Sequence, residues 1–382
     1  LATGANGCTG AMTITLTEPL LTGISSIIDP SCFGYSDGSI DFTSSGGLSP
    51  FTYNWTGPNS FTSNIEDPGG LSATNYNLIL TDSYGCSDTF NYILNEPTPI
   101  STSFITSDFN GYNVSCNGYS DGYIDFTTTG SVPPYDFQWS NGQITEDINN
   151  LQSGTYSLLI TDNNLCTKMD TIIINEPSPL MTNLNSSFNY NGYDISCYGD
   201  SNGGIDLTVS GSVPTYNYLW DNGQTTEDLS MLFVGTYIVD VIDINGCVIS
   251  DSITLSEPSP LVSNINSVYN YNSFDISCFG FSDGAIDVIV NGSVPPYTYS
   301  WNTGGSTQDL NNISSSYYYV NITDANNCPA FQDIVLSEPS PFSSSDSISY
   351  YNGVNISCNS FSDGSIDFDI SGSVPPYNYL WN

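Results

Sequence analysis

The sequence repeats itself with a period of about 80 residues, and this periodicity constrains the fold more than any other feature of the chain. One tryptophan marks each period, at Trp55, Trp139, Trp220, Trp301 and Trp381. Glu-Pro pairs keep the same spacing and begin at Glu18, Glu96, Glu176, Glu257 and Glu338. Such a period is typical of an array of small, similar domains in which each domain contacts its neighbours in sequence.

The Glu-Pro pairs predict where the repeats begin and end. We expect the C-terminal end of one repeat over 1–19 and the N-terminal part of another over 340–382. Four complete repeats are predicted between them, over 20–97, 98–177, 178–258 and 259–339. The chain is therefore expected to be a piece of a longer protein.

Each repeat is predicted to consist of β-strands only. In the third repeat, apolar and polar residues alternate over 204–210, 216–220, 236–243 and 248–256, and turn residues such as Asn222-Gly223 separate these runs. Six to eight short strands in about 80 residues indicate two packed sheets. We predict an all-β fold, a tandem array of Ig-like or PKD-like β-sandwiches that forms an extended filament, with the five tryptophans packed in the cores.

The charge balance excludes several classes of function. The chain has 39 acidic residues, a single basic residue, Lys168, and no histidine. Nucleic-acid binding and binding to anionic membranes both depend on clustered Lys and Arg. Without histidine, paired carboxylates for glycoside hydrolysis are the only catalytic arrangement left. A short acidic motif that recurs in every repeat is typical of a structural element and not of a single catalytic pocket, so we expect that the protein is not an enzyme.

Ten cysteines occur two per repeat, which predicts disulfides and an oxidising, extracellular location. A zinc site is disfavoured because the chain has no CxxC motif and no histidine. The favoured pairing joins the two cysteines of one repeat: Cys32–Cys86, Cys116–Cys166, Cys197–Cys247 and Cys278–Cys328. Each such link would stabilise its repeat by about 4 kcal/mol. The alternative links cysteines about 30 residues apart across a repeat boundary, such as Cys166 and Cys197.

An acidic turn follows the first cysteine of each repeat and offers candidate calcium ligands. These are Asp37, Asp41, Asp121, Asp125, Asp206, Asp283, Asp287, Asp363 and Asp367. A second series of acids, four residues before the second cysteine, would join the site if the two regions meet: Asp82, Asp162, Asp243 and Asp324. The alternative is that Asp-Gly only forms a turn. Calcium is the one cofactor that the sequence suggests.

Four linked motifs of the repeating pattern resemble the SprB repeat, although the first complete repeat has Ser49-Pro50-Phe51 in place of Pro-Pro-Tyr. In the second repeat they are Cys-x-Gly-x-Ser-Asp-Gly-x-Ile-Asp at 116–125, Pro-Pro-Tyr-x-x-x-Trp at 133–139, Gly-Thr-Tyr to Asp-x-x-x-Cys at 154–166, and Glu-Pro-x-Pro at 176–179. That repeat occurs in very large cell-surface proteins of Bacteroidota, of which the best known is the gliding-motility adhesin. The resemblance implies type IX secretion and display as a filament on the outer membrane, where motility machinery drives it.

The resemblance also implies partners and modifications. Proteins of this phylum carry O-glycans at Asp-Ser or Asp-Thr followed by an apolar residue, and the candidate sites here are Thr89, Thr171, Ser252 and Ser347. The expected partners are neighbouring repeats, the outer-membrane motility and secretion machinery, and an extracellular polysaccharide or abiotic surface. Two alternatives to an adhesive filament remain: a lectin-like array that grips polysaccharide through exposed Tyr and Trp, and a rigid spacer that presents a remote adhesive tip.

Overall fold

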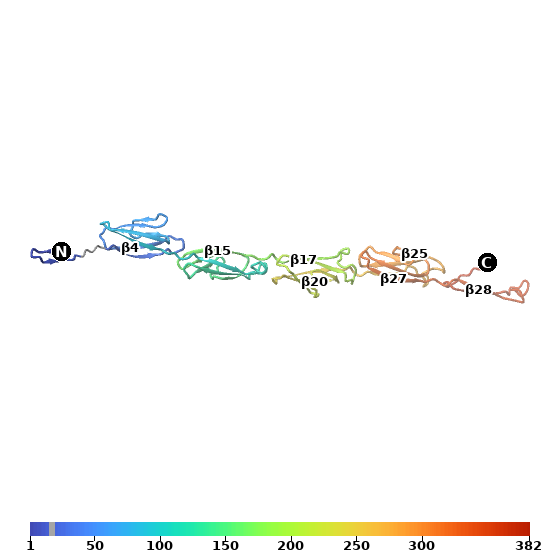
Figure 1. Cartoon of the computed structure of the whole chain (residues 1–382). Coiled ribbons are helices and arrows are strands. Elements are labelled where there is room, and N and C mark those ends of the chain that lie inside the picture. The colour runs from blue at the N-terminus through green and yellow to red at the C-terminus, as the bar shows by residue number, and fades with distance from the viewer. Residues whose placement is uncertain (15–19) are drawn as a thin grey trace. The chain divides into compact units, whose positions relative to one another are not determined.

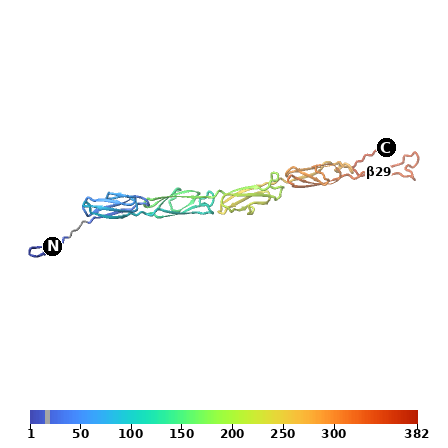
Figure 2. The same ribbon diagram turned by 45° about the horizontal axis from the view of Figure 1, so that its top comes forward.

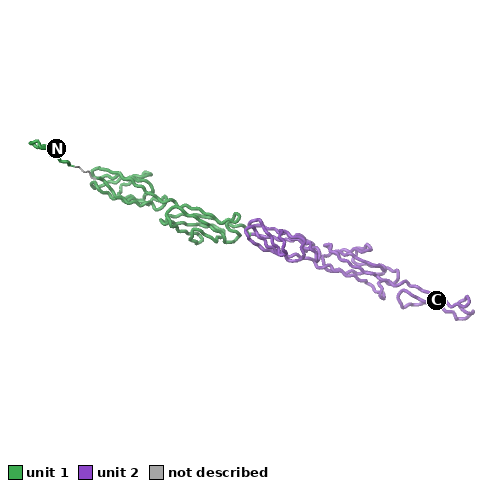
Figure 3. The backbone as a smooth tube through the Cα atoms, turned by 60° about the horizontal axis from the view of Figure 1, so that its bottom comes forward, with its two compact units in different colours: residues 1–179 green, residues 180–382 purple. Residues whose placement is uncertain are grey.

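The computed structural model describes residues 1–14 and 20–382, so Glu18 of the periodic Glu-Pro series lies outside the described residues. The described chain forms two compact units, Leu1–Pro179 and Leu180–Asn382, which we treat separately (Figure 3). Both units consist of antiparallel β-sandwiches whose strands run along the length of each sandwich (Figures 1 and 2). No helix in the described ranges is long and apolar enough to cross a membrane.

The first unit contains two complete sandwiches. The first sandwich is built from β3 (Thr22–Ile28), β4 (Gly38–Ser45), β5 (Thr52–Thr56), β6 (Thr62–Ser63), β7 (Gly69–Leu71), β8 (Asn75–Thr81) and β9 (Ser87–Ile93). Its sheets have the orders β3-β4-β7 and β6-β5-β8-β9. The second sandwich is built from β10 (Ser101–Thr106), β11 (Gly122–Thr129), β12 (Asp136–Trp139), β13 (Ile148–Leu151), β14 (Gly154–Thr161) and β15 (Thr167–Ile174). Its sheets are β10-β11-β13 and β12-β14-β15. A short ribbon of β1 (Ala2–Thr3) and β2 (Thr9–Gly10) precedes both sandwiches.

The second unit repeats the plan of the second sandwich twice. The third sandwich is built from β16 (Met181–Ser186), β17 (Gly203–Ser210), β18 (Asn217–Trp220), β19 (Leu229–Leu232), β20 (Gly235–Ile242) and β21 (Val248–Leu255). The fourth is built from β22 (Val262–Ser267), β23 (Gly284–Asn291), β24 (Thr298–Trp301), β25 (Leu310–Ile313), β26 (Ser316–Thr323) and β27 (Pro329–Leu336). A two-stranded sheet of β28 (Ser343–Ile348) and β29 (Ile366–Ser371) follows. The predicted all-β tandem sandwiches are therefore confirmed.

The tryptophans lie where the two sheets of each sandwich meet. In the four complete sandwiches they are at most 3% exposed, so their predicted core role is confirmed for Trp55, Trp139, Trp220 and Trp301. The indole Nε1 of Trp220 donates a hydrogen bond to the Thr226 carbonyl at 2.9 Å, which satisfies its one polar atom. Trp381 is 63% exposed, and of its repeat the structure describes only the two strands β28 and β29, so its core role stays a prediction.

Two tyrosines and a glycine shape turns in the second, third and fourth sandwiches. In the second sandwich, the Tyr156 hydroxyl donates to the Gln152 carbonyl at 2.9 Å, a contact of the kind that fixes corners in immunoglobulin-like sandwiches. The Tyr135 hydroxyl donates to the carbonyl of Gly130. Gly130 has φ +83°, and a Cβ there would lie 2.2 Å from the Pro99 carbonyl oxygen. Only glycine fits this turn.

The two ends of a sandwich carry different loops, which we call the entry end and the exit end. At the entry end of the first sandwich, where the chain arrives through Leu21, the Leu48 amide donates to Asp82 in the β8–β9 turn at 3.2 Å. At the exit end, where β9 finishes, the Asn95 amide donates to Asp29 at 2.9 Å. β3 and β9 therefore both run from the entry end to the exit end.

Candidate functional site: the disulfide-linked joint

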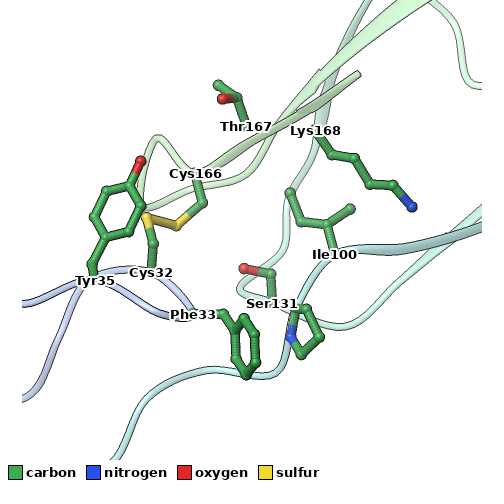
Figure 4. A pocket seen from close by; sticks show the side chains of 9 residues that line it. Cys32, Phe33, Tyr35, Ile100, Ser131, Cys166, Thr167 and Lys168 are labelled. Carbon is green, nitrogen blue, oxygen red and sulfur yellow. A yellow bond between two sulfur atoms is a disulfide. The ribbon is translucent and has the colours of Figure 1, made fainter. Parts of the chain in front are cut away.

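Two disulfides link consecutive sandwiches. Cys32 of the first sandwich is bonded to Cys166 of the second, with Cα atoms 5.6 Å apart and a sequence separation of 134 (Figure 4). Cys197 of the third sandwich is bonded to Cys328 of the fourth, also at 5.6 Å and with a separation of 131. In each case the first cysteine of one repeat meets the second cysteine of the next repeat. Cys116 and Cys247 also take part in disulfide bonding.

The predicted pairing within repeats is wrong. Cys32–Cys86, Cys116–Cys166, Cys197–Cys247 and Cys278–Cys328 are all incompatible with the observed bonds, and so is the alternative Cys166–Cys197. The physical reason is the length of β9, which separates Cys86 at the entry end from the exit end where Cys32 lies. A seven-residue strand spans roughly 20 Å, whereas bonded cysteines have Cα atoms within about 7 Å. Among the described residues, Cys8, Cys86, Cys278 and Cys358 are free and exposed.

The loop of the first cysteine is held at the exit end by two carboxylates. Asp37 accepts a hydrogen bond from the Ser31 amide at 3.0 Å and another from the Ser31 hydroxyl. The serine hydroxyl and then the amide lower the pKa of Asp37 below its usual value. From the other side, Glu96 accepts from the Gly34 amide at 2.5 Å. The Cys-x-Gly and Glu-Pro motifs, about 60 residues apart, are thus two halves of one contact.

The same contact recurs in each complete sandwich. It joins Gly118 to Glu176 at 2.6 Å, Gly199 to Glu257 at 2.7 Å, and Gly280 to Glu338 at 2.7 Å. Taken alone, the sequence shows both motifs only as markers of the period. Their constant mutual distance in every repeat was the signal that they meet.

The turn of the second cysteine is organised around a buried carboxylate. Asp162 is 3% exposed and accepts from the amides of Asn164 and Cys166 at 2.9 and 2.8 Å. It also accepts from the Ser131 hydroxyl and from the Val132 amide at 3.3 Å. Burial opposes ionisation, but the hydrogen bonds from Ser131 and the backbone outweigh it, so the pKa of Asp162 lies below its usual value. This turn presents Cys166 at the entry end of the second sandwich.

Beside each of these two disulfides, an asparagine side chain adds a hydrogen bond between the two sandwiches. The Asn164 side-chain amide donates to the Ser31 carbonyl at 3.0 Å, next to Cys32. In the second unit, Asn326 donates to the Ser196 carbonyl at 2.9 Å and accepts from Asn191 at 2.6 Å. We call these two connections joints. Each of the two combines the main chain, one disulfide and at least one hydrogen bond between its two sandwiches.

An open pocket of about 240 Å³ lies beside the Cys32–Cys166 bond (Figure 4). Phe33 and Tyr35 line it from the first sandwich, and Ile100 and Lys168 from the second. The ammonium group of Lys168 donates to Thr102 at 2.5 Å and lies 3.8 Å from Asp170, within its own sandwich. The one basic side chain of the protein is thus committed to local contacts.

The candidate calcium ligands are not gathered into one site. The turn acids Asp37, Asp121, Asp283 and Asp363 each bind the serine before the first cysteine. The other predicted ligands, Asp41, Asp125, Asp206, Asp287 and Asp367, lie on the strands that follow. The second series binds its own turn at the opposite end of the sandwich, as Asp162 does. Within the ranges 1–14 and 20–382, no group of three or more His, Cys, Asp or Glu residues is placed to hold a metal ion. Hydrogen bonds within the turn account for Asp37, Asp121, Asp283 and Asp363, and calcium binding stays a prediction.

The four candidate glycosylation residues share an exposed position on a strand. Thr89 lies on β9, Thr171 on β15, Ser252 on β21 and Ser347 on β28, and all four are exposed. The three on complete sandwiches occupy the same edge strand, so a modifying enzyme would meet them in the same setting.

Comparison with known proteins identifies the repeat. The family model of the SprB repeat matches five segments: 24–60, 112–144, 191–225, 270–306 and 351–382. These segments contain the first cysteine, the acidic turn and the tryptophan strand of each period. The resemblance found in the sequence is therefore confirmed. No curated protein matches the chain.

Several solved structures are similar in fold. One is a tetra-tandem repeat from the extending region of a large adhesion protein, at 12% identity and a TM-score of 0.28, covering 84% of this chain and 99% of that one. Another is invasin, a bacterial integrin-binding protein, at 10% identity and a TM-score of 0.28, covering 84% and 80%. A third is the N-terminal eight Ig domains of the Down syndrome cell adhesion molecule, at 8% identity and a TM-score of 0.25, covering 94% and 65%.

Proposed function

Because this chain carries five SprB repeats and so belongs to the proteins built from that repeat, we propose that it is a structural segment of a long, secreted cell-surface adhesin. The observation that carries the proposal is the covalent link between consecutive sandwiches, exemplified by Cys32–Cys166. Such a link does nothing for an isolated domain, whereas it serves a chain whose task is to hold its domains in series. Repetition of one unit then provides reach.

The location follows from the same chemistry. Disulfides persist in oxidising surroundings, so the segment works outside the cell. A formal net charge of −38 keeps neighbouring filaments apart and soluble. We place the parent protein on the outer membrane of a member of the Bacteroidota, exported by the type IX route, with O-glycans at Thr89, Thr171, Ser252 and Ser347.

The proposed partners are of three kinds. Neighbouring repeats of the same chain bind through the joints, and regions outside this segment engage the secretion and motility machinery. Extracellular polysaccharide or an abiotic surface is the external target, and gliding motility is the cellular outcome. If the segment is instead a rigid spacer, the adhesive region lies at a remote tip and this segment contributes only length.

A lectin-like role for the tryptophans is not supported. The four indoles of the complete sandwiches are buried and already hydrogen-bonded, as with Trp139 and the Thr145 carbonyl at 2.9 Å. A carbohydrate platform needs an exposed ring face. We therefore retain no role for these residues beyond the core.

The test uses antibodies against the purified segment on intact, non-permeabilised cells. We expect surface labelling, together with loss of surface attachment and gliding in a strain that lacks the repeats. Labelling only after permeabilisation, or unchanged attachment and gliding in the deletion strain, would contradict the proposal. Adding purified segment to a test surface distinguishes an adhesive segment from a rigid spacer, since only an adhesive segment should bind to the surface.

A further inference from the structure

The joints have a property that matters when the chain is pulled from its ends. In the first unit, β3 begins at the entry end of the first sandwich and leads directly to Cys32 at its exit end. Cys166 lies at the entry end of the second sandwich and is followed at once by β15, which ends at its exit end. The disulfide therefore connects one end-to-end strand to another.

We propose that tension along the array is carried by this short route, β3 to Cys32 to Cys166 to β15, so that unfolding of the sandwiches adds little to the length of the chain. The 134-residue loop between the two cysteines lies outside the route. It contains β4 to β14, which form most of both cores. The inference rests on the proposed function only in assuming that the segment is pulled in use.

The lengths support the route. From Leu21 to Cys32 and from Cys166 to Glu176 the chain can span at most about 80 Å when fully extended, with the disulfide included. Two folded sandwiches in series measure roughly 60 to 80 Å, from strands of about eight residues plus turns. The route is thus already close to its full extension in the folded state. Without the bond, the same segment would extend to about 540 Å.

The second unit has the same kind of route, but its chain is somewhat longer than the folded sandwiches require. Tension enters through β16, crosses from Cys197 to Cys328 and leaves through β27. Between β16 and Cys197 the chain makes an additional hairpin, bridged between Tyr190 and Tyr193. The fully extended route is therefore about 100 Å, which allows an extension of a few tens of ångströms before the disulfide becomes taut.

The contacts around the joint fit this role. The loop of Cys32 is clamped by Asp37 and Glu96, and the turn of Cys166 by the four hydrogen bonds to Asp162. Both half-cystines are thus held in place by groups next to other strands of the same sandwiches: Asp37 precedes β4, Glu96 follows β9 and Asp162 follows β14. Strands pulled along their length resist through whole ladders of hydrogen bonds, eight residue pairs in the case of β14 and β15.

Single-molecule stretching of the whole chain, held at its two termini under oxidising conditions, tests the inference. We expect the wild-type chain to extend without steps of domain size. In the Cys32→Ser variant the loop enters the tension path, and the maximal length should grow by several hundred ångströms, up to about 470 Å for the whole loop. The matched control is Cys86→Ser, which removes a free cysteine and should leave the extension unchanged.

Addition of a reducing agent to wild-type tethers keeps the test valid if Cys32→Ser folds poorly. Folded tethers should lengthen stepwise once their disulfides are reduced, with about 200 to 250 Å per sandwich of about 75 residues. Domain-sized steps in the oxidised wild-type chain would overturn the inference. Because no cells are involved, that result would leave the proposed adhesive function standing, and failure of the cell experiments would leave the tension route standing.

Discussion

Replacing Asp162 with alanine should destabilise the second sandwich at the turn that presents Cys166. The carboxylate is 3% exposed and is the acceptor for three backbone amides and the Ser131 hydroxyl. An amide left without a partner in a buried position costs about 1 to 3 kcal/mol. Water entering the space of the lost side chain would satisfy some of these donors. We therefore expect a net loss of about 3 kcal/mol in local stability.

Hydrogen exchange, resolved to the peptides of β14 and β15, measures this change in the full chain. A loss of about 3 kcal/mol corresponds to amide exchange that is faster by roughly 100-fold when reclosing is faster than chemical exchange, so that the rate follows the opening equilibrium. The matched control is Asp136→Asn, an exposed acid on β12 of the same sandwich, for which no change is expected. Unchanged exchange in Asp162→Ala would refute the claim that this carboxylate holds the turn.

Three further changes probe the fold. Trp220→Ala should destabilise the third sandwich by about 3 to 5 kcal/mol, because a large buried aromatic is lost, and near-wild-type exchange in β18 and β20 would contradict its core role. Gly130→Ala should lower the melting temperature, since the added Cβ meets the Pro99 carbonyl at 2.2 Å in a positive-φ turn; an unchanged melting temperature would show that the turn adapts. The folded-state pKa values of Asp162 and Asp324 lie below the usual 3.8, so the stability these carboxylates add is present above that pH and is lost as pH falls through the lower folded values. The melting temperature should therefore fall as the pH is lowered below about 4. A melting temperature that stays constant into strong acid would argue against these hydrogen bonds.

The fold could be predicted from the sequence because its signals are local and repeated. Period-two alternation, Asn-Gly turns and one tryptophan per period are each read within a few residues, and the structure places Trp139 and Trp220 in the cores as expected. For Trp381 the core role stays a prediction, because the structure describes only β28 and β29 of its repeat.

The joint could not be predicted in the same way. Whether two cysteines meet depends on which end of the sandwich each occupies, and spacing along the chain does not carry that information. Cys32 and Cys86 are close in sequence but are separated by the length of β9. The contact of Gly34 with Glu96 holds the Cys32 loop at the exit end of the sandwich. The only sign of this contact in the sequence was that the two motifs recur at a constant distance from each other. The acidic turns were ambiguous because Asp-Gly serves a turn and a cation equally well.

Disulfide mapping of the non-reduced protein from the cell surface tests whether consecutive sandwiches are covalently linked. Since the chain has a single Lys and no Arg, digestion with pepsin or with a Glu-specific protease suits it better than trypsin. We expect peptides that link Cys32 to Cys166 and Cys197 to Cys328. Peptides that link Cys32 to Cys86, or free thiols at Cys166 and Cys328, would contradict this expectation.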